Sequence, residues 1–108
     1  MTRSLLLATL TAAALMTFGS AHAEGNKANG KTLVYTCAGC HGVPGYENAY
    51  PNYRVPKIAG QNEQYLINAL NGYKTGKRKH PTMDAQAESL TEQNIQDIAA
   101  YLSSLAKK

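Results

Sequence analysis

The chain has 108 residues, enough for one small domain, and a formal net charge of +4. We do not expect nucleic-acid binding, because this surplus is small and no basic stripe is interleaved with aromatic residues. The two cysteines carry all the thiol chemistry that the chain can offer.

Residues 1–23 have the pattern of a cleaved secretory signal peptide. Arg3 gives a positive start, residues 5–18 form an apolar run, and residues 21–23 read Ala-His-Ala, which fits the small-x-small cleavage pattern. An uncleaved membrane anchor is the alternative, but the run is shorter than the roughly 20 residues that span a bilayer. We therefore expect a folded domain over residues 24–108, with no stable membrane insertion once the signal is removed.

The first helix is expected over residues 26–38, with Asn26 as a suitable N-cap. Small and apolar residues recur there at helical spacing and would share one face: Gly30, Leu33, Val34, Cys37 and Ala38. That face would deliver Cys37 toward the interior. Gly30 costs helix stability relative to Ala, so it is either a tolerated surface residue or a point of close approach by another helix.

Residues 37–41 read Cys-Ala-Gly-Cys-His, which is the attachment signature of a c-type haem. The thiols would add to the porphyrin vinyl groups, and the imidazole would bind the iron. A thioredoxin-like redox pair would need strands that the sequence does not predict. A zinc site needs four ligands, and a set made with His80 would include Cys40 and His41, which are sequence neighbours. A disulfide would leave His41 unexplained.

The haem prediction and the export signal support each other, because bacterial c-type haem is attached outside the cytoplasmic membrane.

The next residues, 42–53, are expected to form a loop rich in turn residues that also holds Tyr46, Tyr50 and Tyr53. These rings are either ordinary half-exposed packing or partners of the haem edge, and we expect at least one near a haem propionate. Residues 55–60 are expected to be extended. The carbonyl of Pro56 is able to accept the hydrogen bond that orients a ligating histidine.

A second helix is expected over residues 62–73, with Gly72 and Gly76 as stop signals. Its apolar stripe is interpreted as core and haem-pocket wall: Tyr65, Leu66, Ala69, Leu70 and Tyr73. A basic run follows, comprising Lys74, Lys77, Arg78 and Lys79. Most such runs are solvated loops, but a positive rim beside a haem would steer an acidic redox partner.

Met83 is the only methionine in residues 24–108 and is a candidate sixth ligand to the haem iron. The alternative, a core-filling role, is disfavoured because Pro81 and Asp84 flank it in a polar, turn-like stretch. His80 is the rival ligand.

The last helix is expected over residues 91–105, with Thr91 as N-cap.

Four motifs in order make the chain resemble the class I c-type cytochromes, in the short bacterial branch that also supplies each half of two-haem periplasmic cytochromes. They are residues 37–42, Cys-Ala-Gly-Cys-His-Gly; 56–61, Pro-Lys-Ile-Ala-Gly-Gln; 80–83, His-Pro-Thr-Met; and 98–102, Ile-Ala-Ala-Tyr-Leu. The resemblance covers residues 24–108. It implies a small all-α class I cytochrome c fold, with three to four helices around one covalently bound haem c.

The resemblance also implies roles for individual residues. Cys37 and Cys40 would form the thioethers to the haem. His41 would be the proximal ligand and Met83 the distal one. The carbonyl of Pro56 would accept a hydrogen bond from the His41 ring.

Further contacts are implied in the same way. Ile58 would pack on the haem. Gly30 and Val34 of the first helix would cross Tyr101 and Ile98 of the last. The Tyr-rich loop departs from the family pattern, so the resemblance assigns no propionate partners there.

The function expected from these residues is one-electron transport by a periplasmic single-haem protein that is not an enzyme. Its redox partners would dock an acidic surface near residues 74–79. One alternative is a dedicated electron-transfer subunit of an oxidoreductase complex. The other is a haem peroxidase or gas sensor, which requires that Met83 does not bind the iron.

Overall fold

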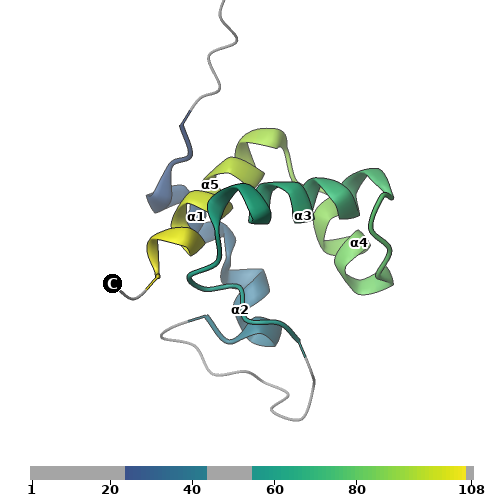
Figure 1. The fold of residues 1–108 in the computed structure, drawn as a ribbon, viewed down its shortest axis with the longest axis horizontal. Helices are drawn as coiled ribbons and strands as arrows, with labels where there is room; N and C mark the ends of the chain where they lie inside the picture. The colour runs from purple at the N-terminus through teal and green to yellow at the C-terminus, as the bar shows by residue number, and fades with distance from the viewer. Residues whose placement is uncertain (1–23, 44–54, 107–108) are drawn as a thin grey trace, which may run out of the picture.

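The computed structural model describes residues 24–43 and 55–106. These residues form five helices and no strand: α1 (Lys27–Leu33), α2 (Tyr35–His41), α3 (Glu63–Thr75), α4 (Pro81–Glu88) and α5 (Glu92–Ser104) (Figure 1). The predicted all-α class is confirmed. The expected signal peptide and the tyrosines at 46, 50 and 53 lie outside the described residues. Among the helices described, none has the length and apolar character needed to span a membrane.

The helix expected over residues 26–38 is in fact two helices that meet at Val34. Asn26 caps α1 as expected, since its side chain accepts from the Asn29 N–H at 3.1 Å. Val34 has φ −71° and ψ −3°, outside the usual α-helical range, so the chain changes direction there. The change lets α1 pack along α5 while α2 carries its cysteines toward a cavity.

Gly30 is the point where α1 and α5 approach most closely. A Cβ at this position would stand 2.0 Å from the Asp97 carbonyl oxygen and 2.8 Å from the Tyr101 Cβ. Both distances are too short for a side chain, so the crossing requires glycine. The close-approach reading of Gly30 is therefore the correct one.

Asp97 links the same two helices through its buried carboxylate. Its Oδ1 accepts from the Asn26 N–H at 2.7 Å and from Gln93 Nε2 at 2.8 Å, and its Oδ2 accepts from Asn29 Nδ2 at 2.7 Å. Burial opposes the charged form of the carboxylate, but these three hydrogen bonds together outweigh it and lower the pKa of Asp97. The sequence analysis missed this residue.

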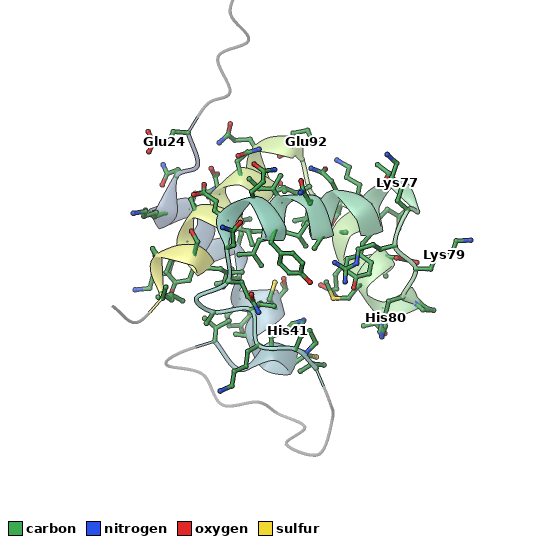
Figure 2. The ribbon with its side chains drawn as sticks, in the orientation of Figure 1. Glu24, His41, Lys77, Lys79, His80 and Glu92 are labelled. Carbon is green, nitrogen blue, oxygen red and sulfur yellow. The ribbon has the colours of Figure 1, made fainter. Side chains whose placement is uncertain are left out.

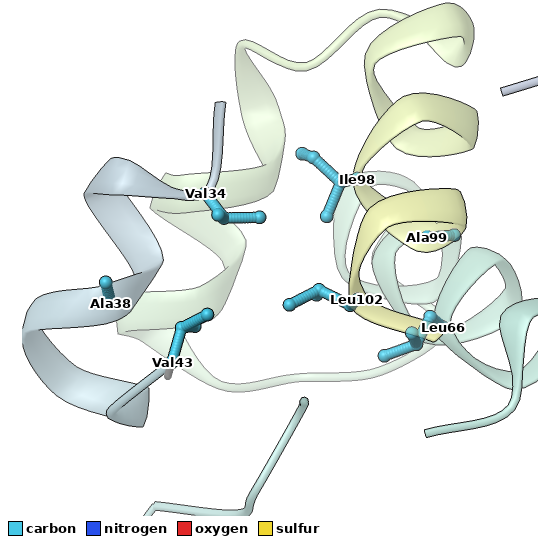
Figure 3. Packing of buried hydrophobic residues seen from close by; sticks show 7 residues of the cluster. All are labelled: Val34, Ala38, Val43, Leu66, Ile98, Ala99 and Leu102. Carbon is cyan, nitrogen blue, oxygen red and sulfur yellow. The ribbon is translucent and has the colours of Figure 1, made fainter. Parts of the chain in front are cut away.

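The core is a single cluster that draws on α2, α3, α5 and one residue on either side of α2. It comprises Val34, Ala38, Val43, Leu66, Ile98, Ala99 and Leu102 (Figure 3). Close backbone contacts among the described helices join α1 to α5, α3 to α5, α3 to α4, and α1 to α2. No such contact joins α2 to α4, which lie apart from one another below α3 (Figure 1).

Of the two glycines predicted to stop α3, only Gly76 does so. Gly72 is buried within the helix and does not stop it, whereas Gly76 ends it in a left-handed conformation with φ 80°. At the other end, Asn62 caps the helix by accepting from the Tyr65 N–H at 3.0 Å.

The stretch around Met83 was expected to be turn-like and is instead the first turn of α4. Its polar residues are the start signals of a helix. Pro81 occupies the first turn, where its missing N–H costs nothing. His80 is the N-cap, and its Nδ1 accepts from the Met83 N–H at 3.4 Å. Helix α5 begins as predicted at Thr91, which forms a capping box with Asn94.

Candidate haem site

A cavity of about 200 Å³ opens between α2, residues 55–61, α3 and α4. All six residues that the sequence predicted to contact haem lie in its lining: Cys37, Cys40, His41, Pro56, Ile58 and Met83. They come from three separate segments of the chain. The fold therefore brings these three segments, which are separate in the sequence, to the wall of one cavity.

Helix α2 supplies three of these groups from one face. Cys37, Cys40 and His41 are three and four residues apart, so their side chains point the same way from the helix. Both cysteines are partly buried. The pKa of the Cys37 thiol is raised, mainly because burial disfavours the thiolate. A hydrogen bond with the Thr36 side chain partly offsets this effect, and the neighbouring Cys40 adds to it.

The imidazole of His41 is oriented by the segment that follows the loop. Its Nδ1 lies 2.7 Å from the carbonyl oxygen of Pro56. A carbonyl oxygen only accepts, so the proton is on Nδ1. Nε2 of the neutral ring then has a lone pair available for a metal ion.

Met83 and His80 lie on the other side of the cavity, at the start of α4. Figure 2 shows His41 and His80 on opposite sides of the open space. Both Met83 and His80 are in the lining, but Met83 is half-buried whereas His80 is exposed. His80 also uses its Nδ1 to cap its own helix. The thioether is therefore the better placed of the two rival ligands.

The wall opposite α2 includes Tyr65 and Tyr73 of α3 and Arg78 of the following turn. The Arg78 guanidinium carbon stands 4.9 Å from the centroid of the Tyr73 ring. A side-chain hydrogen bond with Tyr65 is the main effect that raises the pKa of Arg78. The sequence analysis counted Arg78 only as one member of a charge run.

The basic run divides into two pairs. Lys74 donates from Nζ to the Leu90 carbonyl oxygen, and Arg78 is held by the two tyrosines. Lys77 and Lys79 are exposed and point outward from the turn between α3 and α4 (Figure 2). All four side chains are exposed, but Lys74 and Arg78 are tied to neighbouring groups of the fold.

These groups suit a covalently attached haem. A largely apolar hollow is bounded by two thiols and an oriented imidazole on one side and by a thioether on the other. The zinc alternative gains no support: within residues 24–43 and 55–106, no three His, Cys, Asp or Glu side chains group closely enough to hold a metal ion.

Comparisons with known proteins agree with this site. The family model described as Cytochrome c matches residues 27–106. Cytochrome c4 of Pseudomonas aeruginosa is 42% identical over 86 residues, which are 80% of this chain and 41% of that protein. Cytochrome c-554(548) of Halomonas halodenitrificans is 37% identical over 83 residues, which are 74% of this chain and 96% of that protein.

A third relative is the cytochrome subunit of sulfide dehydrogenase from Chlorobaculum tepidum. It is 34% identical over 82 residues, which are 76% of this chain and 71% of that protein. The chain spans less than half the length of the cytochrome c4 relatives that it matches. The family model covers nearly all of the described residues, so the chain belongs to the cytochrome c family and is a class I c-type cytochrome with covalently bound haem c.

Proposed function

We propose that this cytochrome is a periplasmic carrier that moves one electron at a time between redox proteins. The observation that carries the proposal is the cavity in which two thiols, an oriented imidazole and a thioether face one space. The bound haem supplies the exchange between Fe(II) and Fe(III). The polypeptide holds the haem, fills its axial positions and controls access to its edge.

The placement of each side chain in the cavity lining supports the following roles. Cys37 and Cys40 form the thioether links from one face of α2. Nε2 of His41 is the proximal ligand, and the Pro56 carbonyl fixes the ring. The sulfur of Met83 is the distal ligand. Ile58 packs beside the haem.

Filling both axial positions favours a carrier over an enzyme. A haem peroxidase or a gas sensor needs an open or labile sixth position for its substrate. Met83 lines the cavity from the helix opposite His41, which supports the proposal that its sulfur occupies that position. Little has to rearrange when the iron gains or loses an electron.

The ligand assignment is tested with two matched variants of the holoprotein. Met83→Ala is expected to lose the weak near-infrared absorption of an iron–thioether bond, because Met83 is the only sulfur that the described residues place on that side. His80→Ala removes the rival ligand and is expected to keep that absorption. The assignment fails if the absorption survives in Met83→Ala or disappears in His80→Ala.

Docking is proposed at the turn between α3 and α4. Lys77 and Lys79 alternate in sequence with Arg78 and His80, two residues that line the cavity. Positive charge at this rim would attract a partner with an acidic surface and bring it to the haem edge. A weak and small interface of this kind suits rapid exchange of partners.

A dedicated subunit of an oxidoreductase complex is the second candidate, favoured by the similarity to the cytochrome subunit of sulfide dehydrogenase. Export to the periplasm is supported by the signal-like pattern of residues 1–23. Purification of the native protein separates the two candidates, since a subunit would co-purify with a large partner at fixed stoichiometry.

A further inference from the structure

Lys74 connects the last turn of α3 to the far end of α4. Its Nζ donates a hydrogen bond to the carbonyl oxygen of Leu90, the second residue after that helix. An ammonium donor makes a stronger hydrogen bond than a neutral one, because its charge assists. The bond spans residues 75–89 and therefore encloses the whole segment that carries Met83.

The other hydrogen bonds of this segment form the helix but do not attach it to the rest of the fold. Within the described residues, those of residues 80–90 stay inside α4 and its caps, as between the His80 N–H and Asp84 Oδ1 at 3.3 Å. Close backbone contacts join α4 to α3 alone among the described helices, and Leu90 packs against the core cluster. The attachment of α4 therefore depends on this packing and on the bond from Lys74.

The position of the Met83 sulfur depends on that attachment. Met83 lies in the first turn of α4, one turn before Ala87, which is fully buried. The two residues are four apart, so they share one face of the helix. A methionine side chain has three rotatable bonds, so the location of the helix, more than the side chain itself, determines where the sulfur lies. A restraint on α4 thus raises the fraction of molecules in which the sulfur faces the cavity.

We propose that Lys74 is a positioning residue for Met83, which ties the end of α4 to α3 and thereby keeps foreign ligands from the distal side of the haem. The inference rests on the proposed function, because it needs haem in this cavity and the Met83 sulfur on the iron. Lys74 is not among the residues that line the cavity, so its effect passes through α4.

The test is the affinity of the ferric holoprotein for imidazole, a neutral ligand that has to displace the thioether. Loss of the near-infrared absorption of the iron–thioether bond measures the displacement. Lys74→Ala is expected to lower the apparent dissociation constant about fivefold, because losing such a hydrogen bond makes the open form more populated. Alanine suits the last turn of a helix, so the variant is expected to fold.

Three further variants separate positioning from other effects. Lys77→Ala removes the same charge three residues away and is expected to leave the dissociation constant unchanged. Lys74→Arg keeps a cationic donor of similar reach and is expected to stay near the wild-type value. In Met83→Ala the distal position is already open, so adding Lys74→Ala is expected to change the affinity no further.

An unchanged dissociation constant in Lys74→Ala would overturn the inference and leave the proposed function intact. An equal change in Lys77→Ala, or a further change in the Met83→Ala background, would do the same. If Lys74→Ala yields no holoprotein, Lys74→Gln, whose side chain is neutral and shorter, gives the same comparison. A wild-type protein that lacks covalent haem or the near-infrared absorption would instead overturn the proposed function.

Discussion

A single hydrogen bond decides which nitrogen His41 presents to the cavity. The Pro56 carbonyl lies 2.7 Å from Nδ1, which fixes both the tautomer and the plane of the ring. Because the acceptor is a backbone atom, the orientation depends on the path of residues 55–58 and not on a replaceable side chain. The two cysteines on the same helix face then determine where the porphyrin must lie relative to that ring.

Cys40→Ser is expected to abolish stable covalent attachment, because a hydroxyl does not form the thioether. Acid–acetone extraction followed by haem staining measures the effect, and haem that remains with the variant chain would contradict the attachment role. Gly39→Ala is the matched control within the motif. Nothing lies within 4 Å of a Cβ at Gly39, so this variant is expected to retain its haem.

The residues of the site differ in how far the sequence could predict them. Cys37, Cys40 and His41 follow from local spacing, since their chemistry depends on neighbours in the chain. Arg78 could not be singled out in the same way, because the contacts that distinguish it come from Gly72 and Tyr65 of the preceding helix. From composition alone it resembles the lysines on either side.

At the scale of the helices, α1 and α5 are joined by close packing at Gly30 and by the carboxylate of Asp97. The carboxylate accepts one backbone and two side-chain hydrogen bonds, two of them from residues at the start of α1. Its folded-state pKa is lowered, so the ionised form stabilises the fold. This contribution is complete above the unfolded-state pKa, about 3.9, and is lost as the pH falls through the lower folded-state pKa.

Asp97→Asn is expected to lower the free energy of unfolding near pH 7 by about 2 kcal/mol, because charge-assisted hydrogen bonds are lost and an amide N–H₂ meets other donors. The deficit should shrink when the pH falls below about 4. Urea unfolding of the holoprotein at a series of pH values measures it. A deficit that is constant across this range would show that the charge of Asp97 does not matter.

Two helical features escaped the sequence analysis for physical reasons. The break at Val34 is not marked by glycine or proline, and it arises because α1 follows α5 while α2 turns away. Helix α4 was missed because its N-cap is His80, a residue that seldom fills this role. By contrast, Asn62 and Thr91 are common caps, and the helices that follow them begin where predicted.

At the scale of the whole molecule, two pairs of exposed lysines in the described residues differ in their relation to the cavity. Lys77 and Lys79 are sequence neighbours of the cavity-lining residues Arg78 and His80, whereas Lys27 and Lys31 are exposed on α1, which contributes no residue to the lining. A partner guided by charge to the haem edge would respond to the first pair. A general effect of net charge would respond to both pairs alike.

The double variant Lys77→Glu, Lys79→Glu is therefore expected to slow electron transfer to an acidic partner about tenfold at low salt, with the difference disappearing as salt is added. Stopped-flow mixing at several ionic strengths measures the rate. The double variant Lys27→Glu, Lys31→Glu changes the net charge equally and should have a much smaller effect. Equal slowing by both would contradict docking at this turn.

The separation of α2 from α4 gives the two sides of the cavity different supports. By close backbone contacts α2 is joined to α1 and α4 to α3, and α2 also contributes Ala38 to the core cluster. No residue of α4 belongs to that cluster. The side that carries the thiols and the imidazole is therefore tied to the core, whereas the side that carries Met83 is joined, among the described helices, to α3. A loss of packing is thus expected to affect the thioether side before the imidazole side.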